Sequence, residues 1–207
     1  MTYRLAIFDL DGTLADSFPW FLQIMDQVAE SHGFQPIRAQ DIETVRGLGA
    51  REIIRRQRVP MWRMPLIAAD LRRRKAKDLA SIPLFPGVEA MLGGLAAKGV
   101  VCALVSSDAE DNARRALGAG ARSIAHFACG ASLFGKAKKF RQVLRRTGIA
   151  ARETIAIGDE VRDAEAAAKA GIAFGAVTWG YASADALRRT RPARVFERVD
   201  EVVAKLG

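Results

Sequence analysis

The stretch Leu5-Ala6-Ile7-Phe8-Asp9-Leu10-Asp11-Gly12-Thr13 decides the fold. Its first four residues are apolar, and the polar turn that follows carries two aspartates and a glycine, as expected where a buried strand ends. Further apolar runs lie at Val100–Val105, Ala125–Ala128, Thr154–Ile157 and Ala173–Thr178. These runs are mostly apolar on both alternations, which is typical of strands buried on both faces of a parallel sheet. The chain is therefore expected to be an α/β protein.

Helical stretches separate the later strands, which favours right-handed strand-helix-strand units. Glycine, the residue that a helix C-terminus prefers, directly follows Lys98, Thr147 and Ala170 at the ends of such stretches. They run over Glu89–Lys98, Ala109–Leu117, Ala137–Thr147 and Val161–Ala170.

The segment between the first and second strands breaks this alternation, because all of its periodic stretches read as helix. Ser17 followed by Pro19 favours a helix start, and Gly33 favours a stop. The stretches are Phe18–Ser31, Asp41–Arg46, Ala50–Arg58 and Leu66–Leu79. We expect residues 15–84 to form an all-helical inserted domain, with residues 1–14 and 85–207 forming the core.

The chain is basic, with a formal net charge of +9, and much of the excess lies between residues 51 and 77. Such a charge suits nucleic acid, an anionic surface or an anionic substrate, but it is also typical of a solvated helix face. No apolar run is long enough to cross a bilayer, and the N-terminal stretch lacks the pattern of a signal peptide. We therefore expect a cytoplasmic protein that does not bind a membrane.

Polar side chains collect where the predicted strands end. Ligands of open parallel sheets bind outside the carboxyl ends of the strands, so residues at these ends are expected to meet. They are Asp9 and Asp11, Ser106 and Ser107, then Asp159, Glu160 and Asp163, with Lys136 just before a predicted helix.

Clustered carboxylates repel one another, so a cation is expected among them. Oxygen ligands without a nearby His or Cys favour magnesium. One carboxylate could then attack phosphorus, and another two residues on could protonate the leaving group. Lys136 and Ser106 would stabilise the charge on the phosphoryl oxygens. Taken singly, each motif is also compatible with an ordinary turn, a helix cap or an exposed lysine.

Together these residues resemble the four motifs of the haloacid dehalogenase-like hydrolase superfamily. Asp9–Thr13 resembles its DxDxT motif, Ser106 and Lys136 its second and third motifs, and Gly158–Asp163 its GDxxxD motif. The resemblance implies a Rossmann-like core of three layers with a parallel sheet.

The same resemblance assigns roles to individual residues. Asp9 would be the nucleophile and Asp11 the general acid and base. Magnesium would be bound by Asp9, the Asp11 carbonyl and Asp159. Glu160 and Asp163 would lie next to these ligands without contacting the ion. Thr13 and Ser107 are expected to contact the substrate. Because an alkoxide leaving group needs a proton, an acid at position 11 favours phosphate-ester hydrolysis over dehalogenation.

The inserted helices resemble the α-helical cap of the phosphoglycolate phosphatase and beta-phosphoglucomutase branch. The supporting strings are Asp16-Ser17, Gly47–Glu52 and Phe85–Val88. Arg51 would hold a carboxylate of the substrate, since a guanidinium matches a carboxylate in shape. Two features depart from the branch: Ser107-Asp108 replaces a common Thr-Asn-Lys, and the cap is rich in arginine.

The sequence thus predicts a magnesium-dependent phosphatase that hydrolyses a small-molecule phosphate monoester, with a phosphoglycolate-like acid as candidate, through an aspartyl-phosphate. The alternatives are a phosphosugar mutase or pyrophosphatase on the same fold, and a non-catalytic nucleic-acid-binding protein. A monomer or homodimer is expected.

Overall fold

The computed structural model describes residues 3–132 and 134–206. Its centre is a six-stranded sheet in the order β3-β2-β1-β4-β5-β6, and every neighbouring pair is parallel. The first strand therefore lies in the middle of the sheet, between β2 and β4. The strands are β1 (Leu5–Phe8), β2 (Val101–Leu104), β3 (Ile124–Phe127), β4 (Thr154–Gly158), β5 (Ala173–Val177) and β6 (Arg194–Phe196).

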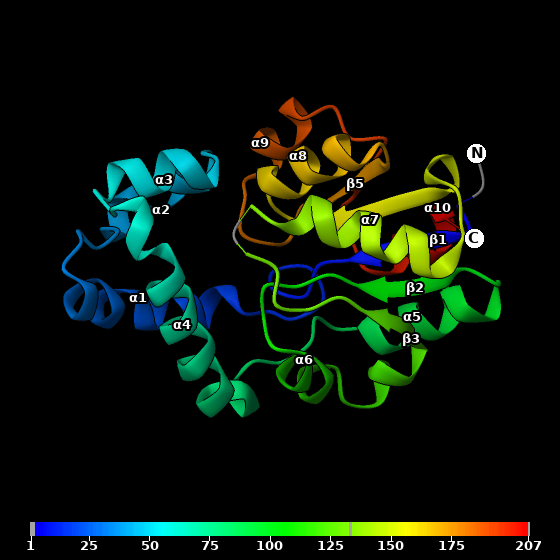
Figure 1. The fold of residues 1–207 in the computed structure, drawn as a ribbon, viewed down its shortest axis with the longest axis horizontal. Helices are drawn as coiled ribbons and strands as arrows, with labels where there is room; N and C mark the ends of the chain where they lie inside the picture. Colours follow the sequence, from blue (N-terminus) through cyan, green and yellow to red (C-terminus); the bar gives the residue numbers. More distant parts are fainter. Residues whose placement is uncertain (1–2, 133, 207) are drawn as a thin grey trace.

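Helices cover both faces of the sheet, so the core has three layers (Figure 1). Alternate residues of β1 face opposite layers: Ala6 and Phe8 pack with one cluster, Leu5 and Ile7 with the other. One layer contains α5 (Val88–Ala97), α6 (Glu110–Leu117) and α10 (Asp200–Leu206). The other contains α7 (Lys136–Thr147), α8 (Val161–Ala170) and α9 (Ala184–Arg189). The predicted three-layer α/β core is confirmed.

The helices between β1 and α5 lie to one side of the sheet, in blue to teal in Figure 1, and form a cap. They are α1 (Phe18–His32), α2 (Ile42–Arg46), α3 (Ala50–Arg56) and α4 (Met64–Asp78). Helix α1 ends at Gly33, whose φ of 64° is the left-handed conformation that glycine adopts without strain. The Ser17 side chain does not cap α1; its hydroxyl lies 3.0 Å from the Tyr181 hydroxyl instead.

Each predicted strand and helix is present, with ends that differ by at most a few residues. The last part of the fold, β6 with α9 and α10, is not predicted from the sequence. Strand β6 has only three residues, of which Phe196 alone is fully buried, so it carries little periodicity to recognise. Within residues 3–132 and 134–206, no helix combines the length and the apolar character that crossing a membrane requires.

Candidate active site

The central position of β1 brings the predicted site residues together at the carboxyl edge of the sheet. Asp9 directly follows β1, Asp159 directly follows β4, and Ser106 lies two residues after the end of β2. The backbone amide of Asp9 still donates to the carbonyl of Ile157 at 2.9 Å, which fixes the start of the turn against β4. Lys136 is the first residue of α7 and reaches the same edge from the neighbouring layer.

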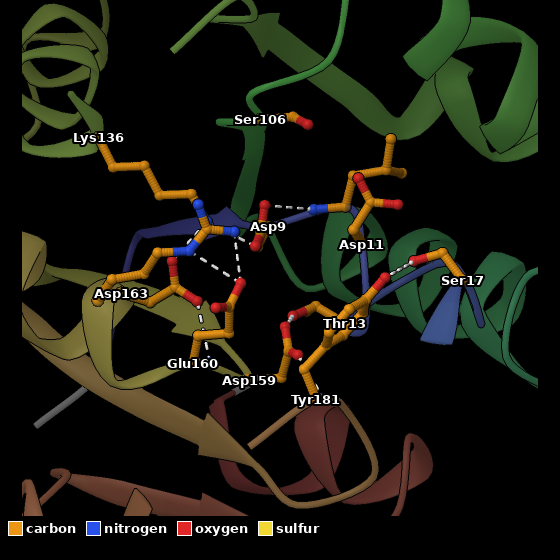
Figure 2. Close-up of polar contacts among 12 residues, drawn as sticks. Asp9, Asp11, Thr13, Ser17, Ser106, Lys136, Asp159, Glu160, Asp163 and Tyr181 are labelled. Carbon is orange, nitrogen blue, oxygen red and sulfur yellow. Dashed lines mark hydrogen bonds and ion pairs between the residues drawn. The ribbon is translucent and has the colours of Figure 1, made fainter. Parts of the chain in front are cut away.

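Lys136 joins two of the aspartates. Its Nζ lies 2.5 Å from Oδ2 of Asp9 and also pairs with Oδ1 of Asp163, and all three side chains are buried (Figure 2). Asp9 also accepts a hydrogen bond of 2.8 Å from the amide of Leu10. A lysine before a helix is usually exposed; this one is held inside because its charge is balanced by two carboxylates.

Asp159 is held by groups from two loops. Its Oδ1 accepts from the Thr13 hydroxyl at 2.7 Å and its Oδ2 from the amide of Tyr181 at 2.8 Å. Gly12, with a φ of 72°, packs so closely that a Cβ there would overlap the Asp159 carboxylate, and the same is true of Gly180. The two glycines thus allow the backbone to close around this aspartate. In this structure Thr13 binds Asp159, while a contact of Thr13 with substrate stays a prediction.

The carboxylates fit a metal ion. Asp9, Asp159 and Asp163 each offer one oxygen, and these oxygens lie within 4.8 Å of one another. Burial raises the pKa of Asp9 to about 6 although Lys136 opposes the change. Burial, with Glu160 and Asp9 nearby, raises the pKa of Asp159 well above its usual value. A hard divalent cation would offset the cost of burying these charged carboxylates close together, and ligands that are all oxygen suit magnesium.

The cluster includes Asp163, for which the sequence predicts a role behind the metal ligands. That role stays a prediction. Asp163 also accepts from the amide of Glu160 at 3.1 Å, as part of the capping box that starts α8. Glu160 itself pairs with Arg162, whose Nε lies 2.8 Å from Oε1. The contribution expected from Asp11 is its main-chain carbonyl, which stays a prediction.

The Asp11 carboxylate forms an ion pair with a cap residue that was not predicted to belong to the site. Nζ of Lys75, on α4, lies 2.6 Å from Oδ1 of Asp11 and 2.9 Å from Oδ2 of Asp108. Burial alone would lower the pKa of Lys75, but the two carboxylates outweigh it and raise the pKa. Burial likewise opposes ionisation of Asp11, yet Lys75 holds the pKa of this carboxyl below its usual value.

The basic stretch 51–77 is not one solvated face, because the side chain of Lys75 is only 5% exposed. Asp70 in the same stretch is also buried and binds His32, Arg73 and Arg74. One sequence signal could have identified Lys75. It follows Ile67 and Leu71 at intervals of four residues, which places it on the apolar face of the helix.

Both serines lie at the same edge. Ser106 is buried, and its hydroxyl accepts from the amide of Asp108 at 3.1 Å, so its proton remains available to a ligand. The carbonyl of Ser107 accepts from Arg72 of the cap at 3.4 Å. Oδ1 of Asp108 accepts from the amide of Ala109 at 2.7 Å and fixes the start of α6.

Arg51 lies outside this group. It is exposed near the start of α3, and its guanidinium carbon lies 4.8 Å from the centre of the Phe134 ring. The structure therefore brings together Asp9, Asp11, Thr13, Ser106, Ser107, Lys136, Asp159, Glu160 and Asp163, and leaves Arg51 apart.

The fold and the site define a class of protein: a capped α/β enzyme whose parallel sheet presents buried aspartates and a lysine at its carboxyl edge. Comparison with known families agrees. The model of the family described as haloacid dehalogenase-like hydrolase matches residues 6–177. The chain belongs to the haloacid dehalogenase-like hydrolase family, and its helical cap places it in the phosphoglycolate phosphatase-like branch.

The relatives that this sequence resembles carry different names. The phosphoglycolate phosphatase of Synechococcus elongatus is 30% identical over 199 residues, which cover 95% of this chain and 94% of the relative. Tyrosine-protein kinase PtkA of Mycobacterium tuberculosis is 30% identical over 212 residues, 99% of this chain and 72% of the relative. A haloacid dehalogenase-like hydrolase of Streptococcus pneumoniae superposes with a TM-score of 0.78 over 99% of both chains, and its 21% identity supports the fold alone.

Proposed function

We propose that the protein is a magnesium-dependent phosphatase that hydrolyses a small-molecule phosphate monoester through an aspartyl-phosphate on Asp9. The observation that carries this proposal is the contrast between two aspartates in one turn. Asp9 lies in the carboxylate cluster with Lys136, and Asp11 lies beneath the cap with Lys75. Two carboxyl groups in different environments suit the two different tasks of nucleophile and general acid.

In the first step an Oδ of Asp9 attacks phosphorus, the bond from phosphorus to the ester oxygen breaks, and the leaving alcohol takes a proton from Asp11. In the second step water attacks the aspartyl-phosphate, Asp11 accepts the proton, and Asp9 is released with inorganic phosphate. Lys136 and the Ser106 hydroxyl would bind the phosphoryl oxygens. Magnesium, bound by Asp9 and Asp159, would neutralise the charge that the carboxylates and the phosphate bring together.

The ion pair with Lys75 suits the second of these steps, because it keeps Asp11 ionised and able to accept a proton from water. Donation of a proton in the first step requires Lys75 to move away from Asp11. Lys75 belongs to the cap and Asp11 to the core. Movement of the cap would therefore switch Asp11 between an ionised state paired with Lys75 and a protonated state away from it.

The names of several relatives make phosphoglycolate a candidate substrate. A phosphosugar mutase or pyrophosphatase would use the same aspartates, so the choice between these reactions depends on what the cap accepts. A nucleic-acid-binding protein without catalysis has no use for the buried carboxylate cluster, which is costly to assemble unless it binds a cation.

The test is phosphate release from a panel of phosphate esters, with magnesium and with a chelator, in the parent and in Asp9→Asn. The amide is nearly isosteric but cannot attack phosphorus, so we expect release to require magnesium and to vanish in the variant. Glu165→Gln, at an exposed position of α8, is the control and should retain full activity. Turnover of Asp9→Asn within tenfold of the parent would exclude the covalent mechanism.

A further inference from the structure

A cavity of about 310 Å³ lies between the four cap helices and the edge of the core. This volume is at the lower end of the range for small-molecule sites, about 300–1,000 Å³. Its lining includes Asp11, Lys75 and Ser107, so the cavity is continuous with the proposed active site. A group bonded to an ester oxygen beside Asp11 would therefore extend into it.

The walls of the cavity above this floor are mainly apolar. Every cap helix contributes: Phe21 and Met25 from α1, Val45 from α2, Ile53 from α3 and Leu71 from α4. Apart from Gln57, these walls consist mainly of hydrocarbon and offer few hydrogen bonds to a hydroxyl or a carboxylate, and burying a polar group without a partner is costly. They favour a hydrocarbon.

Each cation that lines the cavity has a hydrogen-bond or ion-pair partner on the side of the cavity that faces the core. Arg46 donates to the carbonyls of Tyr181 and Gly180 at 3.0 and 3.1 Å. Arg72 donates to Ser107, Arg162 pairs with Glu160, and Lys75 pairs with Asp11 and Asp108. Arg51, the residue expected to hold a carboxylate, is not part of the lining and packs on Phe134. A second anionic group, such as the carboxylate of phosphoglycolate, would meet apolar walls.

We propose that this cavity binds the apolar part of an alkyl or aryl phosphate monoester, which makes the cap selective for hydrocarbon alcohols. The proposal rests on the proposed phosphatase activity. The phosphate would lie beside Asp9 and Lys136, the ester oxygen beside Asp11, and the hydrocarbon among Phe21, Ile53 and Leu71.

The test compares ethyl, butyl and hexyl phosphate with phosphoglycolate and glycerol 3-phosphate, all with magnesium. The alkyl series has nearly constant leaving-group reactivity, so differences in kcat/KM report on binding of the chain. Each buried methylene should raise kcat/KM about threefold to fourfold. We expect hexyl phosphate to exceed phosphoglycolate and glycerol 3-phosphate by at least tenfold.

A pair of variants on α4 links any such preference to the cavity. Ala68 lines the cavity, whereas Ala69 is exposed on the same helix. Ala68→Leu should reduce the preference for hexyl over ethyl phosphate about tenfold, because the new side chain takes the space of the alkyl chain, while Ala69→Leu should leave it unchanged. If Ala68→Leu does not fold, Ile53→Ala enlarges the cavity and should extend the preference toward longer chains.

Binding of ethyl- and hexylphosphonate, measured by calorimetry, tests the cavity without turnover. Tighter binding of the longer phosphonate, lost in Ala68→Leu, supports the proposal. If kcat/KM does not change with chain length, or if phosphoglycolate is the better substrate, the proposed hydrocarbon site is wrong and the phosphatase assignment stands. Failure of every ester to react would overturn the proposed function, and the phosphonate series would still decide what the cavity binds.

Discussion

Replacement of Lys75 by methionine tests the link between the cap and the proposed acid. Methionine is unbranched and one atom shorter than lysine, and it removes the charge, which leaves Asp11 and Asp108 without their cation. Removing one partner of a buried ion pair costs about 3–5 kcal/mol. Because the Asp11 side chain is 25% exposed, we take about 3 kcal/mol, the lower end of that range. At about 2–4 °C per kcal/mol for a chain of this size, Tm should fall by about 6–12 °C.

The assay is thermal unfolding of Lys75→Met beside Lys77→Met, which removes an exposed lysine from the same helix. Adding Asp108→Asn to Lys75→Met should recover part of the loss, because the amide needs no cation and can keep the Oδ1 contact with Ala109. Equal melting temperatures for Lys75→Met and Lys77→Met would refute the reasoning.

The effect of Lys75→Met should also depend on pH. Lys75 lowers the pKa of Asp11 in the folded protein, against the effect of burial, so the pair stabilises the fold fully above the usual aspartate value of 3.8. This stabilisation is lost as the pH falls through the lowered pKa. In Lys75→Met nothing opposes the effect of burial, so Asp11 takes up a proton more readily than in the parent. The difference in Tm between parent and Lys75→Met should therefore be largest near neutral pH and shrink as the pH falls, because protonation of Asp11 removes the unpaired charge from the variant. A difference that stays the same or grows as the pH falls would contradict the assignment to this pair.

Two further predictions concern the reaction and the basic surface. Asp11→Asn should slow hydrolysis of an alkyl phosphate by about 10²- to 10⁴-fold and that of an aryl phosphate less, because a phenolate leaves without a proton; equal slowing would exclude a proton-donor role. The basic stretch 51–77 should bind DNA or RNA only weakly and without sequence preference, with a log-log salt slope of about −0.9 per phosphate contacted, while ester hydrolysis persists at physiological salt. Sub-micromolar binding at physiological salt, together with no hydrolysis, would favour a binding protein.

Local sequence patterns were enough to predict five strands of the sheet, the cap helices and much of the proposed site. Strand β1 and helix α8 have the predicted ends, because apolar runs and terminal glycines act on near neighbours in the chain. Asp9, Ser106 and Asp159 could be placed together because a parallel sheet gathers its carboxyl ends at one edge.

Which charges pair, and which side chains line the cavity of the cap, could be read only from the tertiary structure. Lys75 and Asp11 are 64 residues apart, and Ser17 and Tyr181 are 164 apart, so no local pattern specifies either contact. In the sequence Lys75 looks like one more charge of a basic helix, and Arg51 looks like a ligand for a carboxylate. Packing of the cap on the core buries Lys75 against two aspartates and leaves Arg51 exposed on Phe134. Burial sets the strength and the pKa of a charge, and burial depends on the whole fold.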